Sequence, residues 1–306
     1  MQSYRLTVEY EGTRYRGWQV QKNARSVAGE LLRALEAVGA PVRELGGSGR
    51  TDAGVHALAQ SAHLRLAERR DPEALRRALN AELAKDVHVL ALAPAPPRFH
   101  ARHDAVLRSY LYQLSRRRTA FAKPFVWWVR DRLDLAAIGR AAALIPGRHD
   151  FVRFCERPAE QESTLCQVES VTVAEAEALV LVRITASHFL WKMVRRLVGA
   201  LVRVGTGQLG DEELALLLGG GALPPERPGA GSGAAGSGGS PAEWTAPPSG
   251  LFLERVLYRG DPPLGPPRPV TPVPREPPGA ALTPPSPSSA RAGRAPGSRP
   301  RAGPRR

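Results

Sequence analysis

The residues best suited to chemistry lie in one Gly-rich stretch, from Gly46 to Ala57. This stretch contains one arginine, Arg50, and one acid, Asp52, and two small residues directly follow the acid. Glycine gives the backbone conformational freedom, and the small residues leave room for a bulky group to approach the carboxylate. The alternating run from Leu58 to Leu66 predicts a strand. The pattern therefore predicts one carboxylate held on a tight loop just before a rigid strand.

Two familiar Gly-rich motifs do not fit this stretch. A phosphate-binding P-loop would need a glycine where Glu44 stands and a lysine where Arg50 stands. A dinucleotide fingerprint would need a third glycine in place of Asp52. The residue chemistry alone leaves two alternatives open, namely a catalytic loop or a Gly-rich turn with an Arg–Asp pair on the surface.

The segment from Gly49 to Ala57 resembles the signature loop of the tRNA pseudouridine synthase A (TruA) family. The resemblance extends from about Tyr4 to Tyr258, and several other family motifs occur in the same order, which makes the match specific. These motifs are Tyr15–Gln19, Phe99–Arg102, Arg108–Tyr110, His149–Phe151 and Met193–Gly199.

The resemblance implies an isomerase (an intramolecular transferase) that converts uridine to pseudouridine in the anticodon arm of tRNA, at positions 38, 39 and 40. It implies that Asp52 is the nucleophile or charge stabiliser at C1′ of a flipped-out uridine and that Arg195 is its basic partner. Arg50 resembles the arginine that takes the place of the flipped base. Tyr110 resembles the tyrosine that stacks on the uracil and is available to relay the C5 proton, and Leu251 would contact the uracil.

Three further residues are candidates for contacting RNA. Trp18 lies among aromatic and basic residues, which suits either a core position or stacking on a base. The stretch His188–Val204 has an apolar stripe at helical spacing and predicts a helix. Its flanking cations include Lys192 and Arg196, which fit either a solvated helix face or contacts with the RNA backbone.

The composition and net charge of the chain indicate which classes of partner it binds. The chain has 306 residues, a net charge of +14 and a pI of about 10.8, which point to a polyanion such as nucleic acid. Two cysteines are too few for a disulfide scaffold. The N-terminus lacks a signal-peptide pattern, and no apolar run is long enough to span a membrane. We therefore expect a cytoplasmic protein that does not bind membranes, and the family resemblance adds a homodimer.

We expect neither a metal nor an organic cofactor. His56, His63 and His100 are the histidines nearest the chemistry-bearing motifs, but their spacing fits no common zinc pattern. His100, within the motif Phe99–Arg102, is interpreted as a structural hydrogen-bonding residue.

The order of predicted elements indicates an α+β fold. Strands and helices follow the order β-α-β-β-α-β and then repeat it, which suggests two similar split β-α-β (RRM-like) halves. We expect their antiparallel sheets to join side by side, with helices on one face and the active-site cleft between the halves. The predicted boundaries are 1–105, 106–260 with a flexible Gly/Ala/Ser insertion at 227–242, and a disordered Pro/Arg-rich tail at 261–306 that is dispensable for folding.

A non-catalytic RNA-binding module of RRM-like topology is the alternative reading. Such a module would carry an RNP-type run of basic, glycine and aromatic residues, which is absent from this sequence. Asp52 discriminates between the two, because a binding module does not need this carboxylate.

Overall fold

The computed structural model describes residues 2–156, 163–223 and 239–275, and residues 1–275 form one compact unit. Residues 227–238 of the predicted insertion and 276–306 of the predicted tail lie outside the described residues. No helix in the described part of the chain is long and apolar enough to cross a membrane.

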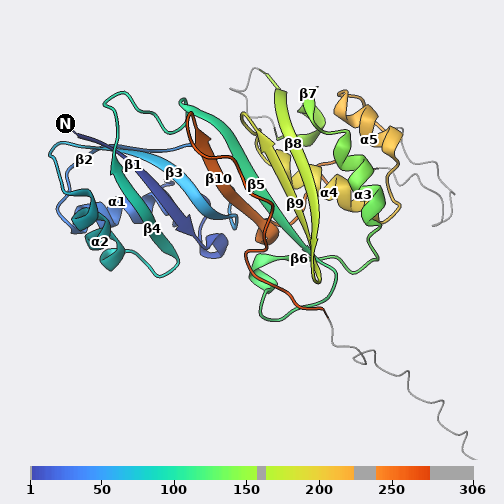
Figure 1. The fold of residues 1–306 in the computed structure, drawn as a ribbon, viewed down its shortest axis with the longest axis horizontal. Coiled ribbons are helices and arrows are strands. Elements are labelled where there is room, and N and C mark those ends of the chain that lie inside the picture. The colour runs from blue at the N-terminus through green and yellow to red at the C-terminus, as the bar shows by residue number, and fades with distance from the viewer. Residues whose placement is uncertain (1, 157–162, 224–238, 276–306) are drawn as a thin grey trace, which may run out of the picture. The chain divides into compact units, whose positions relative to one another are not determined.

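The described chain forms one ten-stranded sheet and five α-helices (Figure 1). The strands are β1 (Gln2–Tyr10), β2 (Val42–Gly47), β3 (His56–Leu66), β4 (Val87–Pro94), β5 (Ala105–Ser115), β6 (Trp127–Trp128), β7 (Gly147–Asp150), β8 (Leu165–Ala176), β9 (Leu179–Ala186) and β10 (Leu251–Tyr258). The helices are α1 (Val27–Ala37), α2 (Pro72–Glu82), α3 (Leu135–Ala143), α4 (Met193–Gly205) and α5 (Asp211–Leu218).

The strands run in the order β4-β1-β3-β10-β5-β9-β8-β7, with β2 also paired to β3 and β6 to β5. The pairing of β3 with β10 divides this sheet into two halves. The first half has the order β4-β1-β3-β2, and the second half has the order β10-β5-β9-β8 with β7 at its edge. The halves meet where β10 pairs in parallel with β3, Phe252 opposite His56 and Leu253 opposite Ala57. Because these strands are parallel, both begin at the same end of the sheet.

Side-chain caps set several helix starts, as expected of Ser and Asp before a helix. Ser26 accepts a hydrogen bond from Gly29 N, and Asp71 accepts one from Ala74 N with Pro72 next to it. The predicted helix from His188 begins instead at Met193. Lys192 has a φ of 62°, which is incompatible with a right-handed helix, so the preceding residues form a turn.

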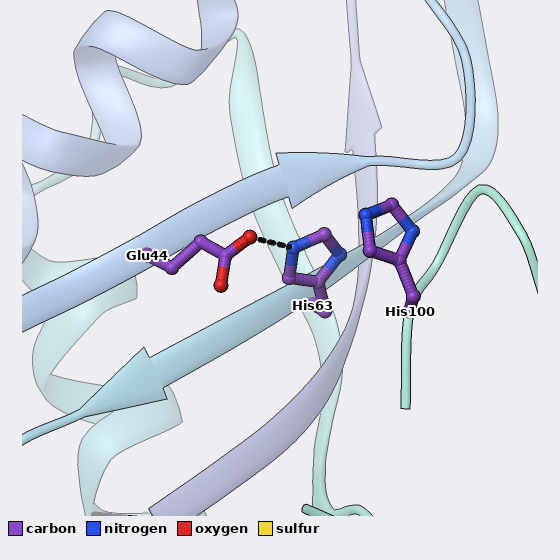
Figure 2. A group of neighbouring side chains, drawn as sticks. All are labelled: Glu44, His63 and His100. Atoms are coloured by element: carbon purple, nitrogen blue, oxygen red, sulfur yellow. Dashed lines mark hydrogen bonds and ion pairs between the residues drawn. The ribbon is translucent and has the colours of Figure 1, made fainter. Parts of the chain in front are cut away.

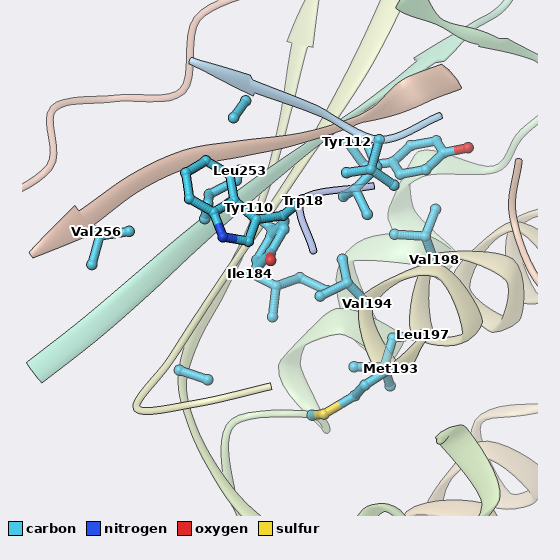
Figure 3. Packing of buried hydrophobic residues seen from close by; sticks show 14 of the residues in the cluster. Trp18, Tyr110, Tyr112, Ile184, Met193, Val194, Leu197, Val198, Leu253 and Val256 are labelled. Atoms are coloured by element: carbon cyan, nitrogen blue, oxygen red, sulfur yellow. The ribbon is translucent and has the colours of Figure 1, made fainter. Parts of the chain in front are cut away.

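One hydrophobic cluster lies between the helices and one face of the sheet (Figure 3). Along β5 the side chains alternate between the two faces. Tyr110 and Tyr112 belong to this cluster with α4 residues such as Leu197, whereas Leu111 faces the other way. Helices therefore cover one face, and α1 and α2 lie beside the strands of the first half while α3, α4 and α5 lie beside those of the second (Figure 1).

The other face of the second half is covered by a segment after β10. Val273 is 1% exposed and packs in a second cluster with Leu111 and Leu181. Ala178 N donates to Val273 O at 3.1 Å, and Val270 N donates to the Gln113 side chain at 2.7 Å. The folded part therefore extends past Gly260, where the sequence analysis placed its end, because a few apolar residues among the prolines suffice to cover this face.

We predict that truncation after Gly260 destabilises the protein and truncation after Arg275 does not. The shorter chain loses Val273, whose burial is worth about 1.5–3 kcal/mol, and leaves Ala178 N without its partner. Thermal melts of the two truncations beside the full chain test this prediction. A melting temperature for the shorter truncation equal to that of the full chain would show that the segment after β10 adds no stability.

Candidate active site

Asp52 lies on the loop between β2 and β3, at the junction of the two halves. Its Oδ2 is 3.3 Å from Nη1 of Arg195, on the first turns of α4 in the second half. The two side chains are 20% and 15% exposed, so each is largely shielded from water but still reachable. The structure thus brings together the acid and the basic partner that the family resemblance assigned, from positions far apart in the sequence.

Arg195 is held by a second contact that fixes its direction. Its Nε donates to Ala246 O at 2.7 Å, and Ala246 N donates back to Arg195 O at 3.1 Å. Helix α4 approaches this segment closely at Gly199, where an added Cβ would lie 1.8 Å from Trp244 O. The glycine therefore permits the packing that places Ala246 beside the arginine.

The loop that carries Asp52 is held in place by contacts with the first half. Thr51 Oγ1 shares a hydrogen bond of 2.8 Å with Tyr10 OH, and Trp18 N donates to Thr51 O at 3.2 Å. Gly17 has a φ of 93°, and a Cβ there would lie 2.3 Å from Thr51 O. The residue next to Asp52 is therefore fixed by both its side chain and its carbonyl.

Arg108 connects the Gly-rich lead-in to the second half. Its buried guanidinium donates to the carbonyls of Ala105, Ser187, Arg102 and Ser48. Burial lowers the pKa of this group, and the carbonyl dipoles take the place of a counter-ion. The sequence analysis quoted Arg108 only as part of a motif. A buried arginine satisfied by backbone carbonyls has no sequence pattern that would distinguish it from a surface one.

Tyr110 lies close enough to Asp52 for the charge of that carboxylate to affect its phenol. It is 9% exposed, and its ring meets Phe189 edge-on at 5.0 Å. Burial raises the pKa of its phenol well above the ordinary value, and the charge of Asp52 adds to that shift. The phenol therefore keeps its proton at neutral pH. Tyr112, two residues later on the same strand, is fully buried and donates to Pro247 O at 2.7 Å.

Leu251 and Arg50 differ in their surroundings. Leu251 is 4% exposed and begins β10, opposite Tyr112 in β5. Arg50 is exposed, two residues before Asp52, and makes no hydrogen bond or ion pair with another residue that the structure describes. Arg50 is therefore free to reach toward a bound molecule.

The three other RNA-contact candidates are occupied within the protein. Trp18 is 3% exposed, so it belongs to the core and offers no ring face to a base. The Lys192 ammonium pairs with Glu156, and Arg196 is 8% exposed and contacts the same carboxylate at 3.7 Å. The single Glu156 carboxylate compensates only part of the charge of Lys192 and Arg196. The Lys192 side chain is 31% exposed, so a contact between Lys192 and the RNA backbone stays a prediction, whereas Arg196 is buried within the protein.

His56 links both halves immediately after the catalytic loop. Gly12 N donates to its Nδ1 at 3.0 Å, so its Nε2 carries the proton and donates to Pro124 O, also at 3.0 Å. The ring stacks on Phe252 of β10 at 4.8 Å. Burial lowers the pKa of His56, against an opposing effect of the Glu11 carboxylate 3.5 Å away. The sequence analysis considered His56 only as a metal ligand and missed this positioning role.

Glu44, His63 and His100 form the one group of the described residues that brings three metal-type ligand atoms together (Figure 2). Hydrogen bonding argues against a metal here. Ala101 N donates to Nδ1 of His63 at 3.2 Å, and Arg102 N donates to Nδ1 of His100 at 3.2 Å. A neutral ring whose Nδ1 accepts must carry its proton on Nε2. In His63, this Nε2–H donates a hydrogen bond to Glu44 Oε1 at 3.1 Å. The group therefore presents N–H donors where a metal needs lone pairs.

Comparison with known proteins assigns the family. The family model described as tRNA pseudouridine synthase matches residues 6–104 and 141–259, which include Asp52, Arg195 and Leu251. The chain belongs to this family. Tyr110 lies in the stretch between the two matched segments.

Individual relatives of the family cover most of the chain. A protein of Sinorhizobium fredii named tRNA pseudouridine synthase A is 37% identical over 263 residues, covering 84% of this chain and 100% of that protein. Relatives of the same name from Beijerinckia indica and Aquifex aeolicus are 42% and 36% identical, covering 71% and 84% of this chain and 85% and 100% of their own lengths. A solved Cbf5-Nop10-Gar1 complex matches with a TM-score of 0.30 at 12% identity, covering 65% of this chain and 45% of that one, too weakly to inform the fold.

We predict that His56→Ala lowers the free energy of unfolding by at least about 2 kcal/mol, because Gly12 N and Pro124 O each lose a buried partner worth roughly 1–3 kcal/mol. His56→Gln keeps an amide that can replace one partner and should lose less. Equal losses in both variants, measured by denaturant unfolding, would assign the effect to ring packing instead.

The same residue predicts a pH dependence. Its folded pKa lies below the ordinary 6.5, so the unfolded chain takes up a proton at His56 at higher pH than the folded chain does. The stability of the natural protein should therefore fall as the pH drops below 6.5, and part of that fall should vanish in His56→Gln. Identical pH profiles for the two proteins would contradict the assignment.

Proposed function

We propose that this protein isomerises uridine to pseudouridine in tRNA. The observation that carries the proposal is the Asp52–Arg195 pair, held at the junction of the two halves in a chain of the tRNA pseudouridine synthase family. We further propose that its targets are uridines 38, 39 and 40 of the anticodon arm, as the family resemblance implies. We also propose a cytoplasmic location, because the proposed substrate is a tRNA.

The isomerisation breaks the N1–C1′ glycosidic bond, turns the uracil and forms a C5–C1′ bond. One proton leaves C5 and one is gained at N1, so no redox partner or group donor is consumed. Asp52 attacks C1′ or stabilises the positive charge that develops there, a task that carboxylates perform in retaining glycosidases. Arg195 directs the carboxylate, since its guanidinium is itself fixed by Ala246 O.

Tyr110 and Leu251 would hold the uracil during its rotation. Burial raises the pKa of the Tyr110 phenol, so its ring can stack on the base as a neutral group. To relay the C5 proton, the phenol oxygen would have to accept that proton while its own O–H proton leaves. Leu251, at the start of β10, would add an apolar contact to the base, as the family resemblance implies. These contacts would keep the detached uracil in place without binding one orientation of it too tightly.

Arg50 would stabilise the RNA after the base has left its stack. It is exposed and has no partner among the described residues, so its guanidinium can enter the position that the flipped uridine vacates. We infer that Arg50 acts on the RNA helix while Asp52, two residues later, acts on the sugar.

A non-catalytic module with RRM-like topology is the second candidate. We propose that the two halves are split β-α-β units of this topology. With the short strands β6 and β7 left aside, each half has four strands. Across the sheet these strands stand in the order fourth, first, third, second, counted along the chain, which supports the proposal. We favour the enzyme because a binding module does not need the Asp52–Arg195 pair. In addition, RRM modules bind several bases on the aromatics of an open sheet face, whereas helices cover the face that carries Tyr112.

We predict that Asp52→Asn lowers the rate of isomerisation at least about a thousandfold, the order of loss expected when a catalytic nucleophile is removed, while tRNA binding remains. The substitution preserves shape and removes the charge. Single-turnover tritium release from C5-labelled tRNA measures the rate. Asp211→Asn is the control, because Asp211 is a partly exposed acid in α5 that pairs with Arg140 and not with Arg195. Release from Asp52→Asn at the control's rate would contradict the enzyme proposal.

We also propose a homodimer. A site that reaches several neighbouring uridines has to hold the body of the tRNA at a surface away from the reacting sugar, and a second subunit can supply that surface. Light scattering at micromolar concentration should give twice the 33.0 kDa mass of the chain. A mass of one chain together with full activity would refute this proposal.

A further inference from the structure

The segment 116–132, which connects β5 to α3, lies at the same end of the sheet as the catalytic loop. Strand β10 begins opposite the end of β5, with Leu251 paired to Tyr112. It also begins beside the start of β3, with Phe252 paired to His56. The chain that leaves β5 at Ser115 therefore emerges where the Asp52 loop enters β3. The segment lies outside the two stretches that the family model matches.

Hydrogen bonds tie the segment 116–132 to the catalytic region. His56 Nε2 donates to Pro124 O at 3.0 Å, within the short 3-10 turn η2 (Lys123–Phe125). Gln113 Nε2 donates to Phe125 O at 2.8 Å, and Ser249 Oγ donates to Val126 O at 3.3 Å. These bonds come from β3, β5 and the turn before β10, so the segment has a defined position relative to Asp52.

The segment is strongly basic. It contains one acid, Asp131, and six cations, which are Arg116, Arg117, Arg118, Lys123, Arg130 and Arg132. Of the cations, Arg116 pairs with Glu175, and Arg117 donates to Pro274 O at 2.6 Å. Arg118, Lys123 and Arg130 are exposed and form no ion pair with any residue in the described ranges. An uncompensated positive charge of this kind attracts a polyanion.

Two aromatic side chains lie among these cations. Phe121 is 97% exposed and Trp128 is 40% exposed. The Arg118 guanidinium lies 5.9 Å from the centre of the Trp128 ring, on its face. Exposed aromatic rings interleaved with arginines form the usual surface for single-stranded nucleic acid, because bases stack on the rings while the cations contact phosphates.

We propose that the segment 116–132 binds an unpaired stretch of the substrate RNA beside the reacting uridine. Phe121 and Trp128 stack on bases, and Arg118 contacts the adjoining phosphate. This inference rests on the proposed function for its substrate and adds a binding surface to it. A second copy of this chain fits less well, because a two-fold interface would bring the same cationic surface against itself.

Binding of an unmodified tRNA transcript tests the proposal. Phe121→Ala should raise the Kd about tenfold, within the range for loss of one base–aromatic stack. It should leave binding of a fully paired RNA duplex unchanged. Arg118→Ala should lower the slope of log Kd against log salt by about one, the loss of one phosphate contact. Leu90→Ala is the control, since Leu90 is 41% exposed on β4 at the far edge of the sheet.

Two results would overturn the proposal. One is a Kd for tRNA unchanged in both Phe121→Ala and Arg118→Ala. The other is a change of the Phe121→Ala mass in light scattering from two chains to one, which would make the surface a subunit interface. Pseudouridine formation by the natural protein is measured separately. Its absence, together with weaker tRNA binding by Phe121→Ala, would refute the proposed function and leave the binding surface standing.

Discussion

The ion pair between Asp52 and Arg195 makes the two halves of this protein depend on each other. The acid comes from a loop of the first half and the arginine from a helix of the second, so neither half holds the pair alone. The two side chains are 20% and 15% exposed, so each charged group has lost much of its hydration. The attraction between the charges offsets this loss only if both groups are held in place. The surrounding contacts of Thr51, Ala246 and His56 supply that fixation.

Several contacts around the pair use backbone carbonyl groups rather than another charge. Ala246 O accepts from Arg195, Ser48 O accepts from Arg108, and Pro124 O accepts from His56. Carbonyl groups have directions set by the fold, so they orient a side chain without competing for the charge of Asp52. Among the charged residues described, the Asp52 carboxylate is therefore paired with Arg195 alone.

Regular elements were predictable from the sequence, and contacts distant in sequence were not. The strand predicted from Leu58 to Leu66 lies within the observed β3 (His56–Leu66), because the alternation of side chains defines a strand locally. Asp52 and Arg195 were identified by resemblance to a family, whereas their 3.3 Å approach depends on tertiary structure. The start of α4 was misplaced because nothing in the sequence marks the left-handed backbone of Lys192. Likewise, Val273 lies in a stretch whose composition resembles a disordered tail, and only the apolar face beneath it explains its order.

The position of β10 also bears on how the molecule is made. It is the last of the strands in the described ranges, yet it lies between β3 and β5 in the middle of the sheet. During synthesis, the free edges of β3 and β5 therefore stay unpaired until the residues of β10 have left the ribosome, after those of the other nine described strands. Contacts of such long sequence separation form slowly. The segment that brings Ala246 to Arg195 leads directly into this strand, so the support that Ala246 gives to the Asp52–Arg195 pair forms only after the other nine described strands have been synthesised.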